Sequence, residues 1–179
     1  MSLKDLTHAA HKDAETKPFV KILFSGKIEP KLYATFLKNQ HPCYDMLEAC
    51  AMATGVLNGL PDIRRSLKIN ADFLELWKEE QEPVILPVVK RYMDHIISIK
   101  DDPKRLMAHV YVRHMGDLAG GQMISKRVPG SGTMYQFTDS DALKAAIREK
   151  ISDDMADEAI VCFGFAAEMF EEMMSLVDE

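Results

Sequence analysis

Cysteine and glycine are both scarce in this chain of 179 residues, which contains three cysteines and nine glycines. Cys43, Cys50 and Cys162 form no Cys-x-x-Cys pair and are odd in number, so a disulfide framework is excluded. We therefore expect three reduced thiols in a cytoplasmic protein.

Long apolar runs and an excess of positive charge are also missing. The longest uncharged apolar run near the carboxyl end covers residues 159–167, whereas a membrane span needs about 18 residues. The amino terminus, MSLKDLTHAAHKDAE, is charged and amphipathic and lacks the apolar core of a signal peptide. The net charge of -6 argues against nucleic acid as the main partner. We expect neither a membrane nor a nucleic acid to be a partner.

Alternating strand patterns, internal repeats and linkers are absent as well, so we predict an all-α, single-domain bundle over residues 1–179. Ser2 is a candidate N-cap, as is Asp102, which precedes Pro103 at a first helical position. Thr138 and Asp141 have the spacing of a capping box. Apolar periodicity predicts helices over residues 2–15, 30–54, a short helix between 61 and 71, and further helices over 71–80, 88–99, from 103, after 138 and 156–176.

The glycines are concentrated in the helix that begins at Pro103. Gly116, Gly120 and Gly121 fall within six residues, and each costs about 0.8–1 kcal/mol relative to alanine inside a helix. Gly120 and Gly121 lie three and four positions after Asp117 and share its side of the helix. Two interpretations are open: a large, flat group comes close to this backbone, or the segment is a helix crossing or loop that needs small residues.

The stretch Tyr-Val-Arg-His-Met-Gly-Asp-Leu-Ala-Gly-Gly-Gln at 111–122 resembles the distal-helix signature of the heme oxygenases. The pattern of Lys4, Thr7, His11 and Glu15 is similar to the proximal helix of that family. The resemblance implies a heme-oxygenase-like bundle in which heme lies between these two helices. It also implies that His11 is the iron ligand and that Glu15 holds the other imidazole nitrogen.

The same resemblance implies roles for further residues. Asp117 would deliver protons through ordered water, Arg113 would belong to the same network, and Gly116, Gly120 and Gly121 would let the helix backbone approach the heme. Heme propionates would be held by Lys4, Lys144 and Arg148, with Tyr111 beside a propionate or the water network. Phe163 would line the heme. His114 departs from the family, which commonly has tyrosine there.

The reaction implied by the resemblance opens heme at a meso carbon and yields biliverdin, carbon monoxide and ferrous iron. It consumes dioxygen and electrons, and heme is both substrate and cofactor. A ferredoxin or a flavoprotein is the expected electron donor. A basic rim formed by Lys4, Lys104, Arg105, Lys126, Arg127, Lys144 and Arg148 is a candidate dock for such an acidic partner.

Three other functions remain open at this point. A heme store or carrier would bind heme without degrading it and would not need Asp117 or its glycines. A di-iron oxidase of similar fold would need Glu-x-x-His pairs, and the chain contains none. A thiaminase-like hydrolase would need a nucleophilic cysteine, for which Cys43 and Cys50 carry no motif.

Overall fold

A computed structural model describes residues 1–177 and shows a bundle of helices with no β-strand among those residues. The α-helices are α1 (Leu3–Glu15), α2 (Pro18–Leu23), α3 (Pro30–Ala53), α4 (Ser66–Leu76), α5 (Pro87–Ser98), α6 (Pro103–Ser125), α7 (Ser140–Lys150) and α8 (Ala156–Met174). Two short 3-10 helices are η1 (Thr133–Tyr135) and η2 (Asp153–Met155). The predicted all-α class is confirmed, and residues 178 and 179 of the predicted domain lie outside the described residues.

The helix starts follow the predicted caps in two cases. At α1, the Ser2 hydroxyl accepts from the Asp5 amide at 3.2 Å, and the Asp5 carboxylate accepts from the Ser2 amide in return, which completes a capping box. At α6, the Asp102 carboxylate accepts from the Arg105 amide, and Pro103 occupies the first turn. Local chemistry alone therefore sets where these two helices begin.

Two predicted boundaries are wrong, because distant carboxylates override the local signal. The Thr138 amide and hydroxyl both donate to Asp62 at 2.9 Å, so Asp139 caps α7 in its place. Helix α4 begins at Ser66 and ends at Leu76, not over residues 71–80. The Glu48 carboxylate accepts the Ser66 amide at 3.1 Å and supplies the cap from outside the segment.

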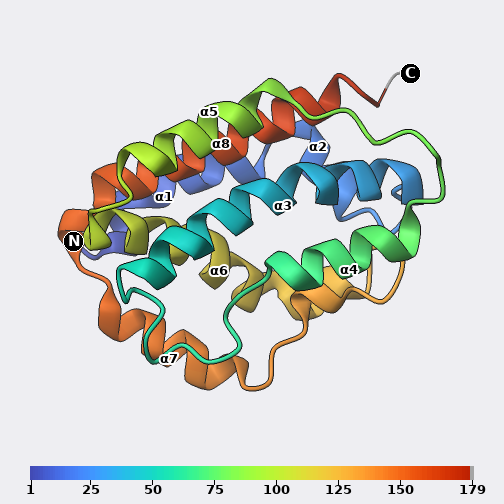
Figure 1. The fold of residues 1–179 in the computed structure, drawn as a ribbon. Helices are drawn as coiled ribbons and strands as arrows, with labels where there is room; N and C mark the ends of the chain where they lie inside the picture. Colours follow the sequence, from blue (N-terminus) through green and yellow to red (C-terminus); the bar gives the residue numbers. More distant parts are fainter. Residues whose placement is uncertain (178–179) are drawn as a thin grey trace.

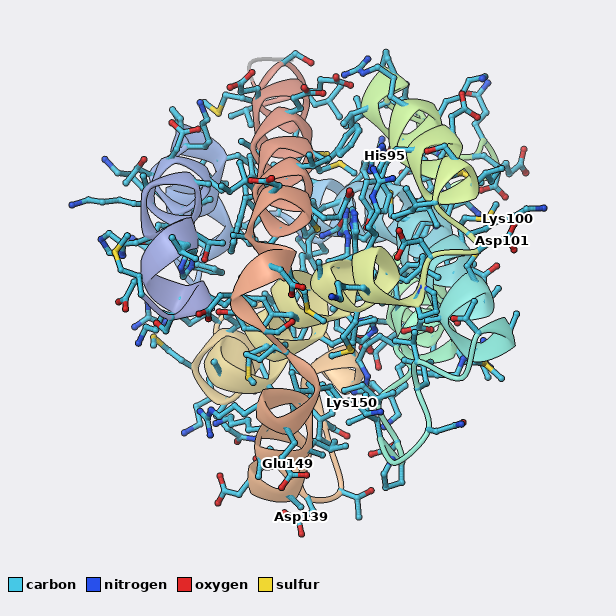
Figure 2. The ribbon with its side chains drawn as sticks, turned by 90° about the vertical axis from the view of Figure 1, so that its left-hand side faces the viewer. His95, Lys100, Asp101, Asp139, Glu149 and Lys150 are labelled. Atoms are coloured by element: carbon cyan, nitrogen blue, oxygen red, sulfur yellow. The ribbon has the colours of Figure 1, made fainter. Side chains whose placement is uncertain are left out.

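Helix α3 crosses the middle of the bundle, and the other helices lie around it (Figure 1). It packs on α4, α5 and α6, while α8 packs on α1, α2, α5 and α6. Helix α6 also packs on α7 and η1. Figure 2 shows α7, with Asp139 and Glu149 labelled, at the opposite end of the molecule from His95 on α5. Helix α8 thus lies between α1 and α6, and α6 packs directly on α7.

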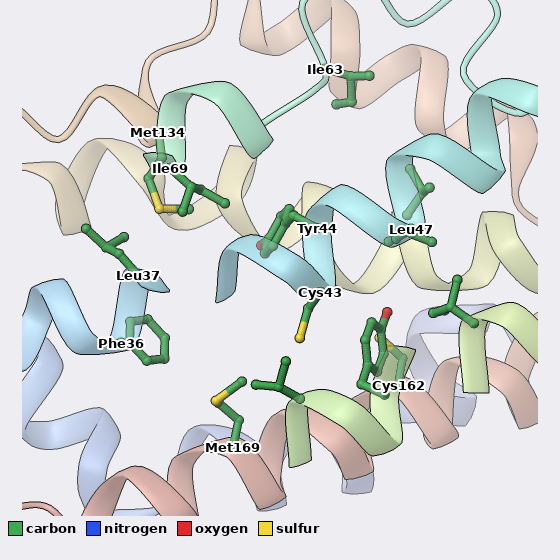
Figure 3. Close-up of a cluster of buried hydrophobic side chains, with 14 of the residues drawn as sticks. Phe36, Leu37, Cys43, Tyr44, Leu47, Ile63, Ile69, Met134, Cys162 and Met169 are labelled. Carbon is green, nitrogen blue, oxygen red and sulfur yellow. The ribbon is translucent and has the colours of Figure 1, made fainter. Parts of the chain in front are cut away.

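The core is centred on α3, which contributes Phe36, Leu37, Cys43, Tyr44 and Leu47 (Figure 3). These side chains meet residues of α4, η1 and α8 on opposite sides. The 24-residue helix continues past Pro42. Along the part of the chain that the structure describes, no helix is both long and apolar enough to cross a membrane.

Candidate functional site

Helix α6 presents an uncharged face on which the backbone is open. Met115, Gly116, Ala119, Gly120 and Met123 follow one another at helical spacing. Gly116 and Ala119 are exposed, and Met123 is 60% exposed. A Cβ atom added at Gly116 would have no heavy atom within 4 Å outside its own helix. This stretch is helical throughout, so the loop interpretation is wrong, and a flat apolar group can approach the helix here.

The other two glycines of this helix have neighbours. At Gly120, an added Cβ would lie 3.1 Å from Cδ1 of Ile124, the far end of a flexible side chain. Gly121 is buried, and its added Cβ would lie 3.3 Å from both the Cβ and the carbonyl oxygen of Tyr135 in η1. The expectation that Gly121 belongs to the open face is corrected, because its small size lets η1 pack against α6.

Asp117, next to the open Gly116, is held by a residue that the sequence did not single out. The Tyr44 hydroxyl of α3 donates to Oδ2 of Asp117 at 2.7 Å. Burial raises the pKa of Asp117 from 3.8 to about 6, against the lowering effects of His114, the Tyr44 hydrogen bond, Arg65 and Arg113. A carboxyl group with this pKa exchanges protons readily near neutral pH.

Arg113 does not contact Asp117 directly. It is only 8% exposed, and its Nε donates to the Tyr92 hydroxyl at 2.9 Å. Its guanidinium carbon lies 4.2 Å from the ring centroid of Tyr92 and 5.3 Å from that of Tyr44. These are cation–π distances. Arg113 therefore packs against both tyrosine rings, and its positive charge lowers the pKa of Asp117. Its place in a proton-delivering water network stays a prediction.

A buried hydrogen bond between a histidine and a glutamate lies next to Asp117, and the sequence did not indicate it. His114 Nε2 and Glu48 Oε2 are 2.8 Å apart, and both side chains are fully buried. Hydrogen bonds from His114 and from the Arg65 and Ser66 amides lower the pKa of Glu48, although its burial acts in the opposite direction. Within residues 1–177, Nδ1 of His114 has no hydrogen-bond partner. The histidine that departs from the family thus anchors α6 to α3 and to the start of α4.

His11 lies on the exposed side of α1, where one face of its ring stacks on Phe163 of α8. The two ring centroids are 5.1 Å apart at an interplanar angle of 20°. His11 Nε2 is 3.4 Å from Oε2 of Glu15, one helical turn further on. The structure therefore brings Phe163 to the pair of His11 and Glu15. One ring nitrogen faces Glu15, and the other has no protein partner among the described residues.

Tyr111 of α6 lies near both Thr7 of α1 and Arg148 of α7. The Tyr111 phenol lies within hydrogen-bonding reach of Thr7 and feels the positive charge of Arg148. Burial raises the pKa of Tyr111 more than these two neighbours lower it. Thr7 lies between Lys4 and His11 on α1, about 6 Å along the helix from His11 at 1.5 Å per residue. The face of α1 that carries His11 thus passes close to Tyr111 and Arg148.

None of Lys4, Lys144 and Arg148 has a carboxylate within 4.0 Å among residues 1–177. Lys144 and Arg148 are one turn apart on α7, whose Leu143 and Ile147 are buried. These three positive charges therefore remain available to acidic groups.

These features fit a flat macrocycle that has an iron atom and two acidic groups. An added Cβ at Gly164 of α8, adjacent to Phe163, would meet no heavy atom within 4 Å, as at Gly116 of α6. An exposed imidazole is present to bind iron, and unpaired cations are present to bind acids. The thiol alternative fits less well, because burial raises the pKa of Cys43 to about 11.

Comparisons with known proteins point in the same direction. The family model described as heme oxygenase matches residues 1–172. Heme oxygenase from Guillardia theta is 28% identical over 204 residues, covering 97% of this chain and 85% of that protein. Heme oxygenase 1 from a Nostoc species is 28% identical, covering 93% and 82%. The crystal structure of heme oxygenase-1 from the cyanobacterium Synechocystis in complex with heme has a TM-score of 0.84 at 24% identity, covering 98% of this chain and 94% of that one, and this likeness shows the fold.

Proposed function

The chain belongs to the heme oxygenase family, and we propose that His11 binds the heme iron while Asp117 manages the protons of ring opening. The enzyme cleaves heme oxidatively to biliverdin, carbon monoxide and ferrous iron, using dioxygen and electrons. One observation carries the assignment of residues: α6 places a carboxyl group with a pKa of about 6 next to a glycine that nothing covers.

Heme, when bound, supplies the iron that activates dioxygen and the carbon that is oxidised. The protein holds it between α1 and α6. The His11 imidazole is positioned by stacking on Phe163 and by the carboxylate of Glu15. Such a partner fixes the tautomer and ring plane of a metal-binding histidine. Opposite it, Gly116 lets the backbone of α6 lie close to the macrocycle.

Asp117 supports the chemistry by holding and moving protons through water. Tyr44 keeps the carboxylate oriented by donating to Oδ2, and Arg113 keeps the Tyr44 ring in place. A general acid or base works best when its pKa is near the working pH, and burial brings Asp117 there. Gly120 lies on the same open face, whereas Gly121 supports it from behind.

Lys4, Lys144 and Arg148 bind the propionates in this proposal, with Tyr111 next to them. Arginine offers a fork that matches a carboxylate, and lysine offers a mobile charge. Holding the propionates fixes the rotation of heme about its iron ligand. These residues would therefore select the meso carbon that faces the oxygen side.

The proposed electron donor is a ferredoxin or an acidic flavoprotein that docks on the basic rim. Two of the rim residues already pair with carboxylates, Lys104 with Asp154 and Arg105 with Glu158, so they are less available to a partner. Lys126 and Lys144 remain on it without such partners among residues 1–177. Turnover with a ferredoxin should fall steeply with ionic strength, whereas turnover with ascorbate should not. Equal salt dependence for both would contradict docking.

We further propose a cytoplasmic location, which the three free cysteines support.

The test of function is to add hemin and a reductant to the purified chain and follow the Soret band. Loss of the band with formation of biliverdin is expected. The Asp117→Ala variant should still bind heme but should lose ring opening, and Asp45→Ala, at an exposed position on α3, is the matched control. A persistent Soret band in the unmodified chain would identify a heme store, and full biliverdin yield from Asp117→Ala would contradict the role of Asp117.

A further inference from the structure

Two imidazoles and a carboxylate from three helices meet at one point, away from His11. His95 Nε2 of α5 lies 2.6 Å from Oε2 of Glu158 in α8, and His109 Nε2 of α6 lies 2.7 Å from the same oxygen. All three atoms are within 4.8 Å of one another. Figure 2 shows His95 on the side of α5 that faces α8.

We propose that this cluster, His95–His109–Glu158, is a site for a divalent transition metal, with Zn²⁺ as the best match. Two imidazoles and one carboxylate are a common zinc ligand set when a fourth position is open. Ligand atoms on a tetrahedral zinc lie about 3.3 Å apart, given metal–ligand bonds of about 2.0–2.1 Å. The two nitrogens therefore need to move away from the carboxylate by only about 0.6 Å.

The residues behind the cluster support metal binding by His109. Its Nδ1 lies 2.8 Å from the Tyr92 hydroxyl, which also accepts from Arg113 Nε at 2.9 Å. When Nε2 binds a metal, Nδ1 carries the proton and donates it to Tyr92. The Tyr92 hydroxyl can then turn its own hydrogen toward Cys162 Sγ, 4.0 Å away. The buried His109 can therefore switch tautomer without leaving a polar atom unpaired.

Glu158 is oriented in a similar way, and the site has an entrance. Arg105 Nε donates to Oε1 of Glu158 at 2.8 Å, which leaves Oε2 for the metal. The side chain of His95 is 20% exposed and that of Arg105 is 48% exposed, so water and a metal ion can reach the cluster from this side. A metal bound here would connect α5, α6 and α8 and would stabilise the fold by binding only the native state.

The experiment is a titration of the heme-free chain, without an affinity tag, with Zn²⁺ alone, followed by calorimetry. We expect one strong site, which Co²⁺ should also occupy with the visible absorption of tetrahedral coordination. Substitution His95→Ala should weaken Zn²⁺ binding by at least about 100-fold, the upper end of the effect of losing an outer partner. His41→Ala, a histidine outside the cluster, should bind as the unmodified chain does.

Thermal unfolding provides a second readout. Zn²⁺ should raise the Tm of the unmodified chain and of His41→Ala but not that of His95→Ala or His95→Asn. The two His95 variants keep the pairs of Glu158 with His109 and Arg105, and circular dichroism will verify that they fold. The proposal is overturned if the unmodified chain binds no Zn²⁺, or if both folded His95 variants bind it with unchanged affinity.

Discussion

Replacing Asp117 by asparagine should stabilise the protein while abolishing its activity. Burial raises the pKa of Asp117 from 3.8 to about 6, so the folded state at pH 7 carries a carboxylate that its surroundings disfavour. At 1.36 kcal/mol per pKa unit the cost is at most about 3 kcal/mol. Asp117 is partly exposed, and screening by solvent reduces this energetic cost. We therefore expect Asp117→Asn to raise the free energy of unfolding by about 1–3 kcal/mol. Asparagine can still accept the Tyr44 hydrogen bond.

The sign of the pH dependence makes the test specific. An acid whose folded pKa is raised favours the folded state at low pH, and this contribution is lost as the pH rises from 3.8 to about 6. The gain from Asp117→Asn should therefore be present at pH 7 and shrink as the pH is lowered toward 4. Urea unfolding at both pH values measures it, and Asp45→Asn is the control. A variant that is no more stable at pH 7, or whose gain is the same at pH 4, would refute the reasoning.

Two further predictions concern the partner of Asp117 on α3 and the glycines of α6. Tyr44→Phe removes the hydrogen bond that stabilises ionised Asp117, and a hydrogen bond to a charged group is worth about 1.5–3 kcal/mol. The pH below which heme turnover falls should therefore rise by about 1–2 units. An unchanged pH profile would contradict this. Gly116→Ala should leave the free energy of unfolding equal or higher but weaken heme binding, because the added methyl group enters open space. Gly121→Ala should instead destabilise the fold, because the added Cβ would lie 3.3 Å from the Cβ and the carbonyl oxygen of Tyr135. Calorimetric unfolding and hemin titration distinguish the two glycine variants. Equal effects of both variants would contradict the different roles given to Gly116 and Gly121.

The sequence was a good guide where the determining chemistry is local. The caps at Ser2 and Asp102 involve residues three positions apart, and the structure confirms both. Prediction failed at Thr138, because the partner of Thr138 is Asp62, 76 residues away in the sequence. Boundaries set by such tertiary contacts cannot be recognised from a local pattern.

The candidate site shows the same division. The resemblance nominated Asp117 and Arg113, but Tyr44, which connects them, lies on another helix and 73 residues from Asp117. Nothing in the sequence near Tyr44 marks it, because its role arises only when α3 and α6 pack together. His114 was noticed as unusual, and its meaning became clear only from Glu48, 66 residues away. The roles toward heme of His11, Lys144 and Arg148 stay predictions.

The Glu48 carboxylate makes the effects of substitutions at Glu48 and His114 depend on each other. It accepts from His114 on α6 and from the two amides that start α4. Loss of His114 alone leaves the buried Glu48 carboxylate with only the two amides and the more distant Arg64, at 3.6 Å, as partners. Loss of Glu48 alone leaves both an unpaired imidazole and two unpaired amides. A double replacement by apolar residues should therefore harm folding less than the two single replacements do in sum. Substitutions at His114 of α6 are thus constrained by a carboxylate that also caps α4.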